Sequence, residues 1–322
     1  MKAIVYHAYG SPEVLQYVDV AKPTAGDNEV LIRVRAACVN PVDWHLMRGT
    51  PYFLRLLAGL RRPSDIRLGA DVAGQVEAVG RNVTKFKPGD EVFGACRGAF
   101  AEYACGSESA LAIKPANVTF EQAGCVRGSA LTALQGLRDK GRIQAGQKVL
   151  INGAAGGVGT FAVQIAKTFG AEVTGVCSTR NVAMVRSIGA DHVIDYTHEN
   201  FTRSGKHYDL ILDSIGNHSL LACRRALSPR GIYIVNGGRD GRWLGPLARG
   251  IRARIVSVFV SQDLVMFLAR RSEEDLTFMQ ELIAAAKVTP VIDRRYRLSE
   301  VAEAIHYLEQ GHARGKVAIA FE

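Results

Sequence analysis

One stretch of the chain, Val149 to Lys167, constrains the fold more than any other, because three local signals follow one another in it. The apolar run 148–151 predicts a buried parallel strand. Residues 153–159 are only Gly, Ala and Val, which predicts a turn whose backbone a ligand can approach closely. Apolar residues at 161, 163, 165 and 166 then predict a helix that ends at Gly170. A strand, a glycine turn and a helix N-terminus in this order are typical of a site for a dinucleotide pyrophosphate.

The residues after the second predicted strand, 171–177, indicate which dinucleotide binds. NAD sites usually place a carboxylate about 20 residues after the glycines, where it binds the ribose 2′-hydroxyl. Here Ser178, Thr179 and Arg180 follow the strand, and no acid stands among them. A hydroxyl and a guanidinium suit a 2′-phosphate, so we expect NADP(H) as the cofactor. The alternative is that Arg180 is an ordinary solvated loop residue.

Composition bounds the class of protein. A length of 322 residues favours two domains of ordinary size. The net charge is +9, but the cations are dispersed and no apolar run approaches membrane-spanning length, so we expect neither a nucleic-acid partner nor membrane insertion. Six scattered cysteines without a Cys-x-x-Cys pair, and a chain that starts at once as a strand, predict a reduced cytoplasmic protein without a targeting segment.

The pattern of strands and helices changes along the chain. Short strands separated by turns predict a partly closed all-β domain up to residue 123. From Gln147 strands alternate with helices, which predicts a doubly wound α/β sheet with strands at 148–152, 172–177, 192–195, 210–214, 231–235 and 255–260. Residues 263–271 are expected to be helical. We therefore predict one domain from 1–123 with 263–322, and a second from 124–262.

Six sequence blocks with defined spacing identify a family: Ala36–Asp43, Gly69–Gly80, Lys87–Val92, Leu131–Ala133, the turn 153–159 and Gly311–Val317. Over essentially its full length the chain resembles the medium-chain dehydrogenase/reductases, in their zinc-independent quinone-oxidoreductase branch. The resemblance implies a GroES-like, partly open β-barrel domain and a Rossmann domain with a six-stranded parallel sheet, with the active site in the cleft between them. It also implies a homodimer, often formed through an edge strand such as the apolar 255–260.

The zinc-ligand positions of related alcohol dehydrogenases are not kept in this chain. Asn40 stands where a Cys is expected, Ala70-Asp71 where a His-Glu pair is expected, and Gly128 where a further Cys is expected. Because a catalytic zinc needs three protein ligands, we expect no metal site; Cys38 and Cys125 are interpreted as buried small side chains, and His45 as packed or hydrogen-bonded. Without a Lewis acid, an unactivated ketone is a poor hydride acceptor, whereas a quinone or α,β-unsaturated carbonyl needs only positioning and hydrogen bonds.

The resemblance also implies roles for individual residues. The expected cofactor contacts are Thr132, Gly156, Gly157, Val158, Ser178, Arg180, Tyr196, Ser214, Gly237, Gly238, Phe259, Val260 and Lys316. Among these, Gly156 to Val158 serve the pyrophosphate, Ser178 and Arg180 the 2′-phosphate, and Phe259 and Val260 the nicotinamide; Tyr196 is alternatively a core residue. The expected catalytic residues are Asn40, Asp43 and Tyr52, with Asn40 bonding a nicotinamide ribose or substrate oxygen. Trp44 is either a pocket wall or a core anchor.

The leading hypothesis is an NADPH-dependent oxidoreductase that transfers hydride to a quinone or α,β-unsaturated carbonyl without zinc. Two alternatives stay open: a non-catalytic NADPH-binding sensor or structural protein, and an alcohol dehydrogenase-type activity on another carbonyl. The Leu- and Arg-rich segment 53–62 fits either an amphipathic lid or a plain surface helix.

Overall fold

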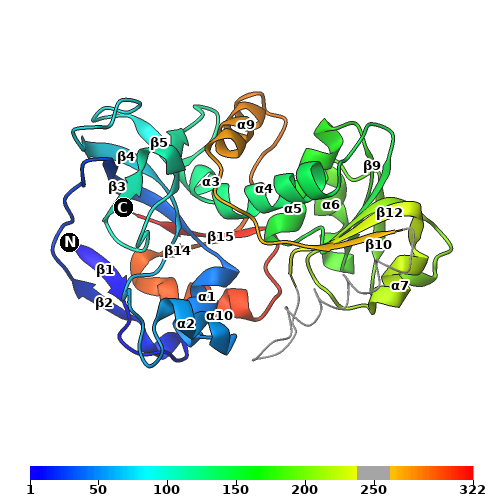
Figure 1. Cartoon of the computed structure of the whole chain (residues 1–322), viewed down its shortest axis with the longest axis horizontal. Helices are drawn as coiled ribbons and strands as arrows, with labels where there is room; N and C mark the ends of the chain where they lie inside the picture. The colour runs from blue at the N-terminus through cyan, green and yellow to red at the C-terminus, as the bar shows by residue number, and fades with distance from the viewer. Residues whose placement is uncertain (238–261, 322) are drawn as a thin grey trace. The chain divides into compact units, whose positions relative to one another are not determined.

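The structure, a computed structural model, describes residues 1–237 and 262–321. The chain divides into two compact units (Figure 1). The first combines Met1–Gly128 with Arg271–Glu322, and the second is the continuous stretch Ser129–Arg270. The boundaries expected from the sequence, after residues 123 and 262, lie a few residues before the observed boundaries, which follow residues 128 and 270. Each unit has its own sheet.

The second unit is built on a six-stranded parallel sheet, as predicted. Its strands are β8 (Lys148–Asn152), β9 (Glu172–Cys177), β10 (His192–Asp195), β11 (Tyr208–Asp213), β12 (Leu227–Val235) and β13 (Asp263–Met266). They lie in the order β10-β9-β8-β11-β12-β13, and every pair is parallel. Counted from β8, this is the order 3-2-1-4-5-6 of doubly wound dinucleotide-binding sheets, in which ligands bind beyond the carboxyl ends of the strands.

One expectation for this sheet is wrong. Residues 263–271 were predicted as a helix, but Asp263–Met266 form the edge strand β13. The strand pairs with β12 from Ile232↔Asp263 to Val235↔Met266 and buries Leu264 against the sheet. These tertiary contacts outweigh the weak helical pattern of the local sequence. The strand predicted at 255–260 lies outside the described residues.

Helices and turns precede or connect these strands. They are α4 (Arg127–Leu134), the π-helical turn η4 (Gln135–Lys140), α5 (Gly157–Thr168), η5 (Thr179–Asn181), α6 (Val182–Ser187), η6 (Phe201–Arg203) and α7 (Leu220–Arg225). The central strands are near-continuous apolar runs because both faces of a parallel sheet are covered. Leu150, Ile211 and Tyr233, for example, are fully buried.

The first unit contains a mixed, mostly antiparallel sheet in the order β14-β15-β3-β4-β5-β7, with β6 also paired to β3. Its strands are β3 (Glu29–Val39), β4 (Asp71–Val79), β5 (Glu91–Ala95), β6 (Tyr103–Ser107), β7 (Leu111–Ile113), β14 (Ile292–Arg297) and β15 (Lys316–Ala320); β1 (Lys2–Val5) and β2 (Gln16–Asp19) form a separate pair. Strand β15 pairs antiparallel with β3, so the last strand completes a sheet that the first forty residues begin.

Short helices surround this sheet. They are η1 (Pro12–Val14), α1 (Pro41–Arg48), η2 (Tyr52–Leu54), α2 (Arg55–Ala58), η3 (Glu108–Ala110), α3 (Phe120–Gly124), α9 (Glu273–Ala284), η7 (Leu298–Glu300) and α10 (Val301–Glu309). The core is formed by strand residues such as Ile32, Val72 and Ile319, against which α10 places Val301 and Ile305. Helix α1 begins at the end of β3, so β3 fixes where its first turn lies.

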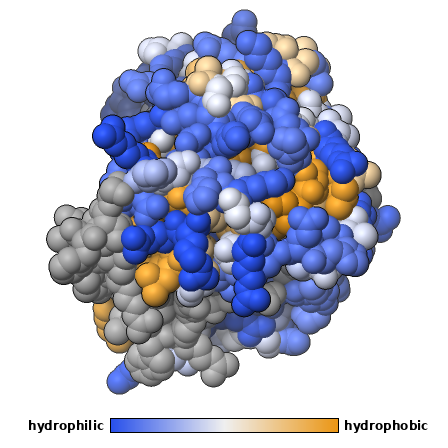
Figure 2. Space-filling view, turned by 90° about the vertical axis from the view of Figure 1, so that its right-hand side faces the viewer, coloured by the Kyte–Doolittle hydropathy of each residue, from blue (hydrophilic) through white to orange (hydrophobic). Residues whose placement is uncertain are grey.

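The face of the molecule seen in Figure 2 is predominantly polar. Figure 2 shows one face of the molecule, on which hydrophilic residues dominate and hydrophobic residues emerge in separate patches. In the part of the chain that the structure describes, no helix combines the length and the apolar character needed to span a membrane. The Leu- and Arg-rich segment 53–62 contains only the end of η2 and the four-residue helix α2, so it is a compact turn and not one amphipathic helix.

Candidate functional site

The glycine turn between β8 and α5 has the geometry of a phosphate cradle. Gly153 has φ +88°, a conformation that L side chains rarely adopt. A Cβ at Gly159 would lie 2.0 Å from the carbonyl oxygen of Gly153, so only glycine lets the helix start this close to the turn. Gly156 caps α5 without a side chain, which leaves the first-turn N–H groups and the positive dipole end for an anionic ligand. The predicted contacts Gly156, Gly157 and Val158 all lie here.

The corner after β9 holds the residues predicted to bind a 2′-phosphate. Ser178 caps the turn η5, and its hydroxyl accepts a hydrogen bond from Asn181 Nδ2 at 3.1 Å. The side chain of Arg180 is exposed. Tyr196 follows the neighbouring strand β10, and its backbone N–H donates to the carbonyl of Cys177 at 3.0 Å. The side chain of Tyr196 is 57% exposed, so it is not a core residue.

An acid that the sequence analysis did not single out also lies at this corner. Asp195 ends β10 and pairs in register with Cys177 of β9. Its Oδ1 accepts hydrogen bonds from the backbone N–H and the hydroxyl of Thr197 at 3.0 and 2.7 Å. Hydrogen bonds from Thr179 and Thr197 lower the pKa of Asp195, so the carboxyl is ionised at neutral pH. The corner therefore presents both a cation and an anion.

A buried acid shapes the carboxyl end of β11. Asp213 is fully buried. Its Oδ1 accepts hydrogen bonds from the backbone N–H groups of Ile215 and Gly216 at 2.9 and 2.8 Å and from Asn152 Nδ2 at 2.9 Å. The hydroxyl of Tyr233 donates to Oδ2 at 2.6 Å, and burial raises the pKa of that hydroxyl. Asp213 thus fixes the turn that carries Ser214. In the sequence, this role could have been inferred from the acid that directly follows the apolar run 210–212.

The remaining predicted cofactor contacts of the second unit are placed as follows. Ser214 Oγ donates to Asn236 Oδ1 at 3.0 Å. A Cβ at Gly237 would lie 2.6 Å from the carbonyl oxygen of Ser214, so these two strand ends are in close contact. Thr132 is half-buried on α4. Gly238, Phe259 and Val260 lie outside the described residues.

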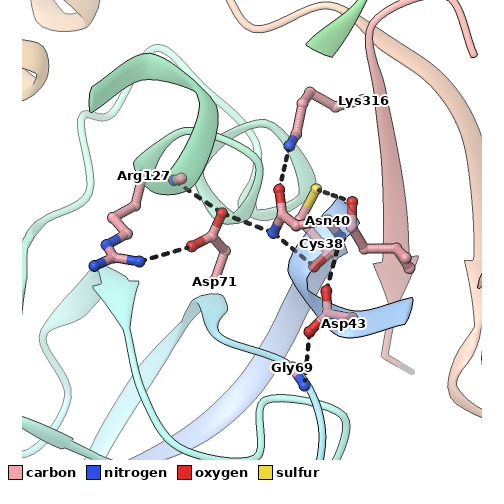
Figure 3. Close-up of polar contacts among 9 residues, drawn as sticks. Cys38, Asn40, Asp43, Gly69, Asp71, Arg127 and Lys316 are labelled. Atoms are coloured by element: carbon pink, nitrogen blue, oxygen red, sulfur yellow. Dashed lines mark hydrogen bonds and ion pairs between the residues drawn. The ribbon is translucent and has the colours of Figure 1, made fainter. Parts of the chain in front are cut away.

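In the first unit, Asn40 lies at the centre of a buried polar network (Figure 3). It caps α1, and Lys316 Nζ on β15 donates to its Oδ1 at 2.7 Å. Its Nδ2 donates to Asp71 Oδ2 at 3.0 Å and to the carbonyl of Cys38 at 3.3 Å. Both amide hydrogens are therefore engaged, and Asn40 can offer a ligand only the second lone pair of Oδ1. The structure thus brings the predicted residues Asn40 and Lys316 together.

Asp43 belongs to the same network through the backbone. It is 1% exposed, and its oxygens accept hydrogen bonds from the N–H groups of Asn40 at 2.7 Å and Gly69 at 3.2 Å. The bond to Asn40 is half of a capping box at the start of α1. Burial raises the pKa of the Asp43 carboxyl to about 7. Asp43 therefore positions Asn40 and the loop of Gly69.

Asp71 occupies the space expected for metal ligands in zinc-dependent relatives. It is fully buried, accepts a hydrogen bond from the N–H of Gly128 at 2.9 Å, and lies 3.8 Å from Nη1 of Arg127. A Cβ at Gly128 would lie 2.7 Å from Asp71 Oδ2, so the carboxylate closes the place where a cysteine would stand. Within residues 1–237 and 262–321, no group of three His, Cys, Asp or Glu side chains could hold a metal ion.

The other residues of this region have structural partners. Cys38 and Cys125 are fully buried and pack with Ala318, which confirms their interpretation as small buried side chains. His45 Nδ1 is 2.7 Å from the carbonyl oxygen of Thr50, and its ring stacks on Trp44 with centroids 3.6 Å apart, so this histidine is packed and hydrogen-bonded as expected. Trp44 itself packs against the core.

Tyr52 is half-buried in η2. The guanidinium of Arg55 lies 5.0 Å from the centroid of its ring. Tyr52 is thus anchored to the segment that follows it, whereas the hydrogen bonds of the Asn40 network run through β3, β4, α1 and β15. Its predicted catalytic role stays a prediction.

Two family descriptions match parts of the chain. Residues 26–117 match the alcohol dehydrogenase GroES-like domain, and residues 188–319 match the zinc-binding dehydrogenase family. Three curated relatives each align with 99% of the chain: the bovine mitochondrial NAD(P)H oxidoreductase RTN4IP1 (35% identical, 89% of its length), an Arabidopsis thaliana chloroplast envelope quinone oxidoreductase homolog (33%, 98%) and the Solanum lycopersicum 2-methylene-furan-3-one reductase (33%, 79%).

Solved structures agree with these relatives. The quinone oxidoreductase of Coxiella burnetii covers 100% of the chain with 99% of its own, at a TM-score of 0.87 and 31% identity. The Escherichia coli quinone oxidoreductase complexed with NADPH covers 100% of both chains, at a TM-score of 0.85 and 27% identity. With the glycine cradle present and Asn40, Asp71 and Gly128 at the zinc-ligand positions, the chain belongs to the medium-chain dehydrogenase/reductases, in their zinc-independent quinone-oxidoreductase branch.

Proposed function

We propose that this protein is an NADPH-dependent reductase that transfers hydride to a quinone or α,β-unsaturated carbonyl without a metal ion. The observation that carries the proposal is the cradle at Gly153–Gly159, where a side chain at Gly159 would meet the backbone at 2.0 Å. A turn this bare, at the first βα connection of a 3-2-1-4-5-6 sheet, fits a pyrophosphate. The structural relative with NADPH bound supports the choice of cofactor.

The residues of the second unit bind and orient the cofactor. The N-terminus of α5 binds the pyrophosphate, and Ser178 with Arg180 binds the 2′-phosphate. Asp213 holds the backbone of Ile215 and Gly216, so the strand end beside Ser214 is rigid before the cofactor arrives. The bound nicotinamide supplies the hydride, and the protein contributes orientation.

The Asn40 network of the first unit positions the acceptor. Lys316 and Asp71 fix both ends of the Asn40 amide, so its remaining lone pair has one direction. That lone pair accepts a hydrogen bond from a hydroxyl of the cofactor ribose or of the reduced acceptor. No Lewis acid is required, because a quinone or an enone already accepts hydride at carbon when it is aligned. Tyr52 remains the candidate wall of the acceptor site.

The test compares cofactors in a matched pair of variants. Arg180→Ala removes the proposed phosphate ligand, and Arg186→Ala removes another exposed arginine, from the following helix α6. We expect Arg180→Ala to raise the Kd for NADPH about tenfold or more, which is the loss of a charge-assisted hydrogen bond, and to leave the Kd for NADH unchanged. Arg186→Ala should change neither. A preference for NADPH that survives Arg180→Ala would show that Arg180 does not bind the 2′-phosphate. The Asp195 carboxylate at the same corner could accept hydrogen bonds from the ribose hydroxyls of NADH.

Activity separates the proposal from its main alternative. NADPH oxidation is followed with a panel of small quinones, enones and simple ketones. The proposal predicts turnover of the first two classes and little of the third. Tight NADPH binding without oxidation by any acceptor would instead establish a non-catalytic NADPH-binding protein.

Two properties rest on the sequence and the family alone. We propose a cytoplasmic location because the six cysteines are all free thiols. The names of relatives include mitochondrial and chloroplast proteins, so cell fractionation is the test that separates these locations. We also propose a homodimer, which sedimentation at several concentrations would test.

A further inference from the structure

One segment of the first unit projects hydrophobic side chains into solvent. Leu56, Leu57 and Leu60 are 71%, 84% and 71% exposed. Arg61 and Arg62 follow directly and are exposed as well. Residues 55–62, named here the leucine turn, therefore combine three solvated leucines with adjacent cations. Single exposed hydrophobic residues are ordinary, but a cluster of this kind usually marks an interaction surface.

The fold holds the leucine turn rigidly in this orientation. Arg55 points back into the unit, where its Nε donates to the carbonyl of Gly49 at 3.0 Å and its guanidinium lies 4.6 Å from the ring centroid of Tyr9. The hydroxyl of Tyr9 in turn donates to the carbonyl of Gly59 at 2.6 Å. Because these bonds fix both ends of α2, Leu56 and Leu57 point away from the protein.

The far side of the turn is closed in the same way. The N–H and the hydroxyl of Ser64 both donate to the carbonyl of Ala58, at 2.7 and 3.0 Å. Gly59 has φ +111°, and a Cβ there would lie 2.1 Å from the carbonyl oxygen of Arg62, so the chain reverses too tightly for any other residue. Exposure of three leucines to water is unfavourable, yet the hydrogen bonds of Arg55, Tyr9 and Ser64 hold the turn in this conformation.

The chemistry of the turn favours a lipid surface over a protein partner. A stable protein interface takes about 20 to 30 residues on each partner, whereas the leucine turn has eight. A membrane interface, in contrast, binds a few apolar side chains together with cations that meet anionic headgroups. The net charge of +9 adds long-range attraction to such a surface. We propose that the leucine turn docks the protein peripherally on anionic membranes, with the three leucines among the lipid headgroups and Arg61 and Arg62 at the lipid phosphates.

This docking would bring a peripheral protein to the place where apolar quinones and enones concentrate. It goes beyond the proposed reductase activity and does not depend on it, because vesicle binding needs neither cofactor nor turnover. The two proposals therefore succeed or fail separately.

The test measures co-sedimentation of the full-length protein with sucrose-loaded vesicles of phosphatidylcholine alone or with about a third phosphatidylglycerol. One variant carries Leu56→Ser, Leu57→Ser and Leu60→Ser, and a second carries Arg61→Gln and Arg62→Gln. The matched control carries Leu221→Ser, Arg225→Gln and Arg230→Gln, which are also exposed but lie in the second unit. We expect binding only to the anionic vesicles, weakened by salt, and reduced about tenfold or more by either turn variant but not by the control.

Two results would overturn the proposal. The first is a wild-type protein that stays in the supernatant with anionic vesicles at low salt. The second is equal binding by the turn variants and the wild type, which would assign the attraction to the dispersed charge.

Discussion

The hydroxyl groups of two buried tyrosines provide a sharp test of how the second unit is stabilised. Tyr233 donates at 2.6 Å to the buried carboxylate of Asp213. The hydroxyl of Tyr208, on the adjacent strand β11, is buried beside the Thr174 side chain, without a hydrogen bond of ordinary geometry among the described residues. Replacing each by Phe removes one oxygen and leaves the ring, so neither change opens a large cavity. The two variants differ in whether the lost hydroxyl made a strong hydrogen bond in the folded protein.

The expected magnitudes have opposite signs. A hydrogen bond to a charged group contributes about 1.5 to 3 kcal/mol, so Tyr233→Phe should lower the free energy of unfolding by about 2 kcal/mol. Tyr208→Phe removes a buried polar group that makes at most a poorly formed bond to Thr174, so it should leave the free energy of unfolding unchanged or raise it by up to about 1 kcal/mol. Because Asp213 also holds the turn at Ile215 and Gly216, Tyr233→Phe should in addition weaken NADPH binding.

Urea unfolding followed by circular dichroism measures both differences, and fluorescence titration measures NADPH affinity. The midpoint of Tyr233→Phe should lie clearly below that of the wild type, and the midpoint of Tyr208→Phe at or above it. Equal destabilisation of the two variants, or a larger loss for Tyr208→Phe, would refute the assignment of the stability to the bond between Tyr233 and Asp213.

Three further predictions concern the sites. Gly159→Ala places a Cβ 2.0 Å from the carbonyl of Gly153, so thermal melting should show a loss of about 1 to 3 kcal/mol and titration a weaker NADPH complex; a variant with wild-type affinity would contradict the cradle. Burial raises the pKa of the Asp43 carboxyl to about 7, against an ordinary value near 4 in the unfolded chain. Between these two pH values the folded state keeps the Asp43 proton and the unfolded state loses it, so the free energy of unfolding falls as pH rises from about 4 to about 7. Asp43→Asn should flatten that part of the pH–stability curve, measured by urea unfolding at pH 5 and pH 8, and an unchanged curve would count against the shift. Lys316→Met removes the donor to Asn40 and should lower kcat/KM at least about tenfold; unchanged kcat/KM would contradict the role of the Asn40 network. An unchanged NADPH Kd would show that Lys316 acts through Asn40 and is not the cofactor contact that the family resemblance implies.

Local signals allowed most of the fold to be predicted. The glycine turn, the helix after it and the apolar strands are encoded within short windows, because backbone geometry and burial on both faces depend on neighbouring residues. The edge strand β13 was missed for the opposite reason. Its four residues become a strand only because β12 offers them a hydrogen-bonding edge, and nothing within Asp263–Met266 carries that information.

The sites divide in the same way. The glycines of the cradle were predictable because the local backbone requires them: Gly153 has φ +88°, and a Cβ at Gly156 or Gly159 would meet the carbonyl oxygen of Gly153. The orientation of Asn40 was not, because Lys316, which fixes it, is 276 residues distant in the chain. Asp71 was considered only as a failed zinc position, whereas its carboxylate fills the space beside Gly128. A single sequence shows which residue types are present but not which of them converge.

The path of the chain also has a consequence for biosynthesis. The second unit is one uninterrupted stretch, whereas the first begins at the N-terminus and receives β15 only at the end. As the polypeptide leaves the ribosome, the nucleotide-binding half can therefore fold while β3 still exposes an open edge. Lys316 follows the whole second unit in the chain and emerges after it. Newly made protein would acquire its cofactor cradle first and the Asn40 network only once β15 has emerged.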